Sequence, residues 1–217
     1  MNRLITIKGT GNISIKPDLT IITMNLESQK YDYEETMKLA AKSINILQDA
    51  IETAGFDRKD LKTTNFNIRT HYENYRDKDN NYKSKFDGYV CEQGLKLEFD
   101  FNTDLMSKVL TAIGKAPIEP NLNIQFSIKD KDAVNEELLI RATENAKRKA
   151  EILTKALGVT LGDLISIYYN WRELHLYSPT RFNLEEQSMP MAKLSAPDIE
   201  PDDIDVSDTV TFVWEIK

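Results

Sequence analysis

The chain has one cysteine, 8 glycines and 7 prolines among its 217 residues. A single cysteine excludes an internal disulfide framework and a multi-cysteine zinc site. No apolar run approaches the roughly 20 residues that a membrane-spanning helix needs, so the sequence predicts no transmembrane segment. Its 28 basic residues are outnumbered by 35 acidic ones, and the net charge of −7 argues against general nucleic-acid binding, which depends on clustered cations.

The first residues show no export signal. The start, MNRLITIKG, runs directly into strand-like alternation, without the apolar core and small-residue cleavage site of a signal peptide. As written, the sequence is typical of a cytoplasmic protein. A mature exported or envelope-associated chain whose leader had been removed would begin in the same way, so export is the alternative.

The pattern of apolar residues predicts the order of the elements. With 41% hydrophobic and 29% charged residues, the chain has the composition of a globular protein with a sizeable core. Stretches of alternation and stretches of helical spacing follow one another as ββαββαβαββ. This order favours an α+β fold, with a mixed, largely antiparallel curved sheet on which two long helices and one short helix pack. We expect a single domain over residues 1–217, with an irregular insertion at about 170–205.

Residues 132–162 predict a long helix with a buried face of small side chains. The residues expected on this face are spaced by four and three positions. They are Leu138, Ala142, Ala146, Ala150, Leu153 and Leu157. Three successive alanines favour close approach to a sheet, because only methyl groups separate the backbones. Pairs such as Glu137 and Arg141 predict a solvated outer face, and Gly158 is expected to end the helix.

Isolated polar and reactive residues form no catalytic constellation. Gly9 and Gly11 precede a strand and not a helix, so they predict a close backbone approach or a β-bulge and not a phosphate loop. Cys91 shares the inward parity of its strand and is expected to be a buried, unreactive thiol. His71 is expected on an outward face and His175 in the irregular insertion, without further metal ligands. The sequence therefore predicts no catalytic residue, no metal and no cofactor.

The insertion at about 170–205 combines prolines, aromatic residues and an acidic end. The acidic run from Asp198 to Asp208 lacks the spacing of an EF-hand, so a solvated acidic surface is expected. Aromatic residues and methionines are enriched in interface cores, and we therefore expect a homo-oligomer held together by this insertion. Alternatively, the insertion folds back over an edge of its own sheet. The candidate interface residues are Trp171, Leu174, Tyr177, Phe182, Leu184, Met189 and Met191.

Three segments carry a resemblance to a known family. They are GTGNISIKPD near the start, GYVCEQGLKLEF with the following FNTDLMSKVLTAIG, and the alanine-faced helix ending in KALGVTLGDL. Together they resemble the SIMPL-domain family over nearly the whole chain. The matching positions are Gly9, Gly11, Pro17, Asp18, Gly88, Tyr89, Ala146, Ala150, Leu157 and Gly158. The resemblance implies an α/β fold with a curved sheet, self-assembly, and often a place in the bacterial envelope with links to stress tolerance. It implies no established reaction.

Two functions remain open at this stage. The favoured one is a non-enzymatic SIMPL-like protein that self-assembles and acts through protein contacts. The alternative is a small-ligand-binding protein or an enzyme whose site forms only when distant residues meet in three dimensions. A deep pocket lined by Asp18, His71 or Tyr89 would favour the alternative, whereas a shallow surface with broad contacts would favour assembly.

Overall fold

A computed structural model describes residues 3–170, 172–180, 182–184 and 199–217. The strands are β1 (Leu4–Ile15), β2 (Leu19–Lys30), β3 (Lys62–Arg76), β4 (Tyr82–Asp100), β5 (Asn121–Ser127), β6 (Leu161–Tyr168), β7 (Phe182–Leu184) and β8 (Ile204–Ile216). The helices are α1 (Tyr33–Thr53), α2 (Thr103–Lys115) and α3 (Lys131–Leu157), with a short 3-10 helix η1 (Arg58–Asp60). The predicted order is confirmed, and β7 is an additional short strand within the insertion.

The α+β class is confirmed, but the strands form two sheets instead of the expected single one. A three-stranded sheet has the order β1, β8, β6, and a five-stranded sheet has the order β3, β4, β2, β5, β7. The chain leaves the first sheet at Pro17, which cannot donate to a ladder. The Asp18 N–H then donates to the Ser127 carbonyl at 3.1 Å, and the Asp18 carboxylate accepts from the Lys129 N–H at 2.8 Å. These bonds hold the chain between β1 and β2.

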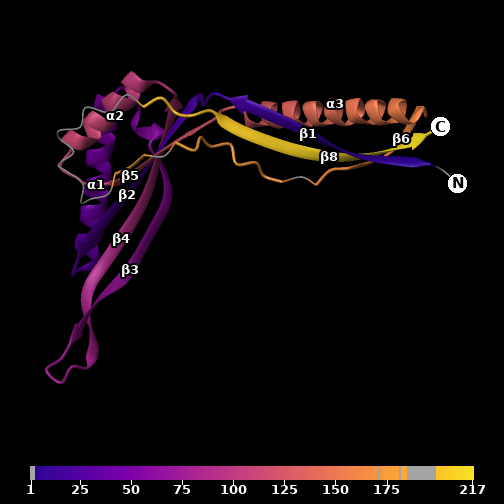
Figure 1. Cartoon of the computed structure of the whole chain (residues 1–217). Coiled ribbons are helices and arrows are strands. Elements are labelled where there is room, and N and C mark those ends of the chain that lie inside the picture. The colour runs from indigo at the N-terminus through magenta and orange to yellow at the C-terminus, as the bar shows by residue number, and fades with distance from the viewer. Residues whose placement is uncertain (1–2, 171, 181, 185–198) are drawn as a thin grey trace. The chain divides into compact units, whose positions relative to one another are not determined.

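The chain comprises two compact units. The first holds residues 1–18, 127–179 and 201–217, and it contains the three-stranded sheet and α3. The second holds residues 19–126 and 180–200, and it contains the five-stranded sheet with α1 and α2. Within the first unit, α3 lies along β1 and β8; within the second, the β3–β4 hairpin extends beyond the end of α1 (Figure 1).

α3 packs on its sheet through a row of residues spaced by four. The buried members are Val134, Leu138, Ala142, Ala146, Ala150 and Thr154. This row confirms the predicted alanine face. The prediction that Leu153 and Leu157 continue it is wrong, since they are 45% and 72% exposed. Residues spaced by four form a ridge that is inclined to the helix axis, so the buried row continues to Thr154 and not to Leu153 or Leu157. The Thr154 hydroxyl donates to the Ala150 carbonyl at 2.9 Å.

Two glycines let β1 approach α3. A Cβ atom added at Gly9 would overlap the carbonyl oxygen of Ala142, and one at Gly11 would overlap that of Leu138. The close approach expected at these glycines is therefore confirmed, and β1 runs through both of them. Because the helix backbone lies against the strand backbone, side chains larger than a methyl group have no room in the middle of α3.

The helix ends largely follow the sequence signals. Asp32 and Asn102 cap α1 and α2 by accepting from the backbone N–H three residues further on. Gly158 ends α3 in the left-handed conformation, with φ of 69°. α2 passes Gly114 and ends at Lys115.

The core of the second unit lies between its sheet and the helices α1 and α2. Residues of β2 and β4 alternate into this core. Cys91 of β4 is fully buried, as expected. Burial, together with the neighbouring Glu92, raises the pKa of the Cys91 thiol. β3 is less buried than β2 and β4. Its Phe66 lies on the core-facing side of the sheet but is 50% exposed.

Candidate functional site

Part of the predicted interface lies outside the residues that the structure describes. Trp171, Met189 and Met191 belong to that part. Phe182 and Leu184 lie in β7, whose backbone pairs antiparallel with β5 at the edge of the five-stranded sheet. Their role in an interface stays a prediction.

The remaining two predicted interface residues contact their own unit. Leu174 packs beside the buried Leu176 in a hydrophobic cluster of the first unit. Tyr177 forms a β-bridge with Ser127, and the Lys131 ammonium lies 5.3 Å from the centre of its ring. Residues 172–179 thus contact their own unit, and the interface role of Leu174 and Tyr177 stays a prediction.

Side chains of α3 close the outer edge of β1. They stand four residues apart on the helix and bind three alternate residues of the strand. Arg141 donates to the Asn12 carbonyl at 3.0 Å, Asn145 accepts from the Thr10 N–H at 3.1 Å, and Lys149 donates to the Lys8 carbonyl at 3.0 Å. Alternate residues of an edge strand turn their N–H and carbonyl groups outward, so these bonds occupy groups that another strand would need.

β6, at the opposite edge of the same sheet, is open by comparison. Among the described residues, no comparable row of side-chain hydrogen bonds covers its backbone. Its ladder with β8 is irregular on both sides of Leu164. Four large apolar side chains of β6 are about half exposed: Leu164 (47%), Ile165 (51%), Ile167 (55%) and Tyr168 (64%). Contiguous exposed apolar residues on an edge strand are typical of a contact surface.

An aromatic cluster of the second unit lies where the β3–β4 hairpin extends beyond the end of β2. Its members are Tyr31, Tyr33, Tyr72, Phe86 and Tyr89, whose rings meet edge to face with centroids 5.4 to 5.7 Å apart. Each such contact contributes about 0.5–1.5 kcal/mol beyond burial. Tyr31, Tyr33 and Tyr72 are exposed, so the cluster forms an apolar surface next to the start of α1.

A bulge in β4 creates this cluster. In the ladder with β3, His71 lies opposite Gly88 and Tyr72 lies opposite Phe86, so Asp87 is an extra residue. Gly88 has φ of 105°, and a Cβ atom there would overlap the carbonyl oxygen of Lys30. The extra residue places Phe86 on the same side of the sheet as Tyr89.

The histidines do not converge with other reactive groups. His71 Nε2 lies 3.9 Å from the carboxylate of Asp87, which also accepts from the Gln29 side-chain amide at 3.1 Å. His175 is exposed and meets the ring of Tyr177 edge to face. Over the described part of the chain, no group of three or more His, Cys, Asp or Glu side chains is placed to hold a metal ion.

The acidic run ends in a buried carboxylate. Asp208, expected to be solvated, is buried, and the Tyr169 hydroxyl donates to it at 3.0 Å. Arg172 Nε lies 3.7 Å from the same carboxylate. Burial raises the pKa of the Tyr169 phenol, and the hydrogen bond to Asp208 raises it further. The prediction of a wholly solvated run is wrong at Asp208, because Tyr169 and Arg172, which follow β6 in the chain, lie against its carboxylate.

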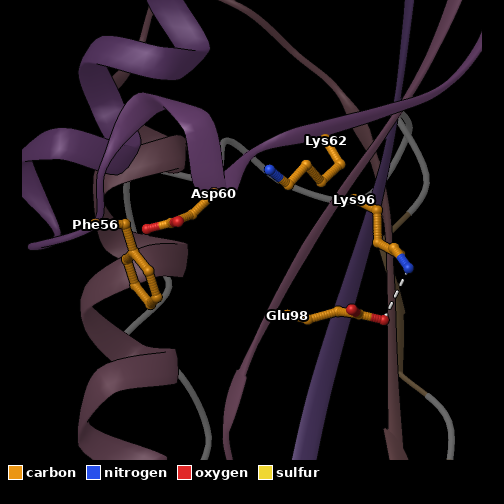
Figure 2. A pocket seen from close by; sticks show the side chains of 5 residues that line it. All are labelled: Phe56, Asp60, Lys62, Lys96 and Glu98. Carbon is orange, nitrogen blue, oxygen red and sulfur yellow. Dashed lines mark hydrogen bonds and ion pairs between the residues drawn. The ribbon is translucent and has the colours of Figure 1, made fainter.

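Two of the hollows formed by the described residues are open to solvent. The first, of about 360 Å³, is lined by Phe56, Asp60, Lys62, Lys96 and Glu98, as Figure 2 shows. Lys96 is paired with Glu98 at 2.9 Å, and the two acids balance the two bases. The second, of about 550 Å³, is lined by Lys8, Ile167, Tyr168, Tyr169, Asn170, Thr209 and Thr211. Neither is lined by Asp18, His71 or Tyr89, the residues whose convergence would favour a ligand site.

Comparison with known proteins places the chain in a family. Residues 5–214 match the model of the SIMPL family, described as a protein of unknown function (DUF541). A 26 kDa periplasmic immunogenic protein of Brucella melitensis biotype 1 is 26% identical over 163 residues, which are 75% of this chain and 65% of that protein. The protein of the same name from Brucella abortus strain S19 has the same identity and coverage. The chain thus spans slightly less than two thirds of the length of these relatives.

A further relative is the uncharacterized protein YggE of Edwardsiella ictaluri, which is 22% identical over 162 residues, or 75% of this chain and 66% of that protein. The cytoplasmic location expected from the first residues finds no support here, because the Brucella relatives are named periplasmic proteins. None of the helices in the described part of the chain is long and apolar enough to span a membrane. Since the family match covers nearly every residue, the chain belongs to the SIMPL family.

Proposed function

We propose that the chain is a non-enzymatic, exported protein that acts by assembling with further copies of itself. The contrast between the two edges of the three-stranded sheet carries this proposal. Side chains of α3 occupy the edge of β1, whereas β6 presents four half-exposed apolar side chains. A second protein surface that covered β6 would remove this apolar area from water.

The residues that carry the family resemblance support a structural role. Gly9 and Gly11 let α3 approach β1, and Asp18 holds the backbone that follows β1 by accepting from the Lys129 N–H. Gly88 forms the bulge of β4, and Gly158 ends α3. The fold accounts for each of these residues, so no catalytic role is needed to explain any of them.

The names of two relatives support an exported location. Both are named periplasmic proteins. A link to stress tolerance, which the resemblance implies, belongs to the same proposal. Fractionation of cells that express the complete native gene should recover the protein with periplasmic markers, and recovery with cytoplasmic markers would refute export.

Solution mass tests the assembly. Light scattering at micromolar concentration should give a multiple of the 24.9 kDa chain mass. The double variant Ile165→Lys/Ile167→Lys should lower this mass, because charges on an edge strand oppose pairing. Ile140→Lys is the matched control, since Ile140 is 53% exposed but lies on α3. The proposal fails if the native protein is monomeric, or if the control lowers the mass as much as the double variant.

A further inference from the structure

β3 forms an edge of the five-stranded sheet, and β4 is its neighbour there. Asn65–His71 pairs without interruption with residues 94–88 of β4. Ladder irregularities lie on both sides, between Thr63 and Asn65 and between His71 and Tyr72. The regular part of the edge is therefore a stretch of seven residues, which spans about 24 Å at about 3.4 Å per residue.

Within the described part of the chain, no helix covers the core-facing side of this stretch. Phe66 and Ile68 lie opposite Gln93 and Cys91, which are both buried on the side of β4 that α1 covers. α1 packs mainly on β2 and β4, so Phe66 remains half exposed. The apolar side of the sheet thus continues for one strand beyond the helix that covers it.

The other side of the stretch is polar. It carries Asn65, Asn67, Arg69 and His71. Arg69 is paired with Glu92 of β4 at 2.9 Å, so the only arginine of the stretch is already balanced within its own chain. An edge with one apolar side and one nearly neutral polar side can accept a strand of the same character.

We propose that this strand is β3 of a second copy. The two strands pair antiparallel about a two-fold axis at Ile68, and the two five-stranded sheets become one continuous sheet. A two-fold axis perpendicular to the sheet brings the same edge of two copies together and keeps their apolar sides on one face. The inference rests on the proposed assembly and adds to it a contact separate from β6.

The position of the axis follows from the sequence of the stretch. Ile68 is its centre, so an axis there pairs all seven residues of each copy. Ile68 then meets its own copy, Phe66 meets Thr70, Asn67 meets Arg69, and Asn65 meets His71. Apolar and uncharged residues face one another on the core side, and no two arginines are opposed. An axis at Arg69 would place two guanidinium groups opposite each other, which is unfavourable.

The contact is expected to be weak by itself. A strand pair of this length covers roughly half of the about 800 Å² per partner that a standard stable interface buries. It should therefore form reversibly and act together with other contacts in an assembly. A covalent trap detects such a contact better than a measurement of mass does.

A cysteine at the axis provides this trap. Ile68→Cys is made together with Cys91→Ser, because Cys91 lies opposite Ile68 and could form a bond within the chain. Directly opposed residues have Cα atoms about 4.5–5.5 Å apart, within the range of a disulfide. Mild oxidation of the folded Ile68→Cys/Cys91→Ser variant should give a disulfide-linked dimer. Asn67→Cys in the same background is the control, since Asn67 faces Arg69 of the partner and should cross-link several-fold less. Equal yields at both positions would overturn the pairing.

Charge variants test the register independently. With the axis at Ile68, residue 66 of one copy meets residue 70 of the other. In the cross-linking background, Phe66→Lys/Thr70→Glu therefore places opposite charges together, and Phe66→Lys/Thr70→Lys places like charges together. The first variant should cross-link several-fold faster at low salt, and high salt should reduce the difference. Equal rates at low salt would refute the register.

The outcomes separate this inference from the proposed function. An oligomeric native protein that shows no cross-link at Ile68→Cys would refute the β3 pairing and leave assembly intact. Cross-linking at Ile68→Cys in a protein whose mass is insensitive to Ile165→Lys/Ile167→Lys would support the β3 pairing and refute the role of β6. A native protein that is monomeric and gives no cross-link would refute both.

Discussion

Replacing Gly9 by alanine adds one methyl group at a very tight contact between β1 and α3. The added Cβ atom would overlap the Ala142 carbonyl oxygen and lie 2.8 Å from the Cβ atom of Ala146. Carbon atoms in favourable contact are about 3.5–4.0 Å apart. Strand and helix must therefore separate by about 1 Å, and both contacts involve atoms fixed by the helix backbone or directly attached to it.

The cost of this separation has two parts. Overpacking a well-packed core lowers stability by about 1–3 kcal/mol. The separation also lengthens the hydrogen bond from the Thr10 N–H to Asn145, now 3.1 Å, and a typical hydrogen bond contributes about 0.5–1.5 kcal/mol. We expect Gly9→Ala to lower the free energy of unfolding of the first unit by about 2–4 kcal/mol.

Urea unfolding followed by circular dichroism measures this change. Gly158→Ala is the matched control in the same unit, because a Cβ atom there meets nothing within 4 Å and only the positive φ of 69° is unfavourable. That strain costs about 1–2 kcal/mol. Gly9→Ala should therefore unfold at a lower urea concentration than Gly158→Ala. A midpoint equal to that of the native protein would refute the close contact between β1 and α3.

Three further predictions concern single groups and the insertion. Native protein should resist Ellman's reagent at Cys91 and react fully once unfolded, and rapid labelling of the folded form would contradict its burial. The raised pKa of Tyr169 stabilises the fold below the ordinary tyrosine pKa of about 10, and this contribution is lost as pH rises through the folded pKa. Tyr169→Phe should therefore weaken the fall of the urea midpoint above about pH 10, and an identical pH profile would contradict the raised pKa of Tyr169. Replacing residues 185–196 with a Gly/Ser linker, which spares the packed Leu174, should give a folded monomer if the insertion holds an oligomer; an unchanged oligomeric mass would exclude that role.

The features that could be predicted from the sequence depend on residues near one another in the chain. A close backbone approach at Gly9, the alanine face and the burial of Cys91 all follow from local spacing or parity, although the partner of Gly9 does not. Strand partners could not be predicted in this way, because Leu4 at the start of β1 pairs with Glu215 at the other end of the chain. The division into two sheets depends on such distant pairs.

Contacts between the long polar side chains of α3 and the edge of β1 could not be predicted either. Arg141 forms the expected pair with Glu137 at 2.7 Å, but its guanidinium also donates to the Asn12 carbonyl of β1. Spacing along a helix predicts which charges are neighbours on the helix. It does not show which of them can reach across to a strand edge, since the long stems of arginine and lysine extend over the surface.

The open edges were missed for a related reason. Ile165 and Ile167 alternate in β6 as Ile5 and Ile7 do in β1, yet Ile167 is 55% exposed and Ile7 is 6% exposed. Both strands lie at edges of the sheet and pair with β8, but α3 covers β1 and hardly contacts β6. Alternation therefore predicts which side of a strand is apolar, but only the number of neighbours decides whether that side is buried. In this protein, a search for interface residues must begin at the edge strands β3 and β6, whose sequences look like those of core strands.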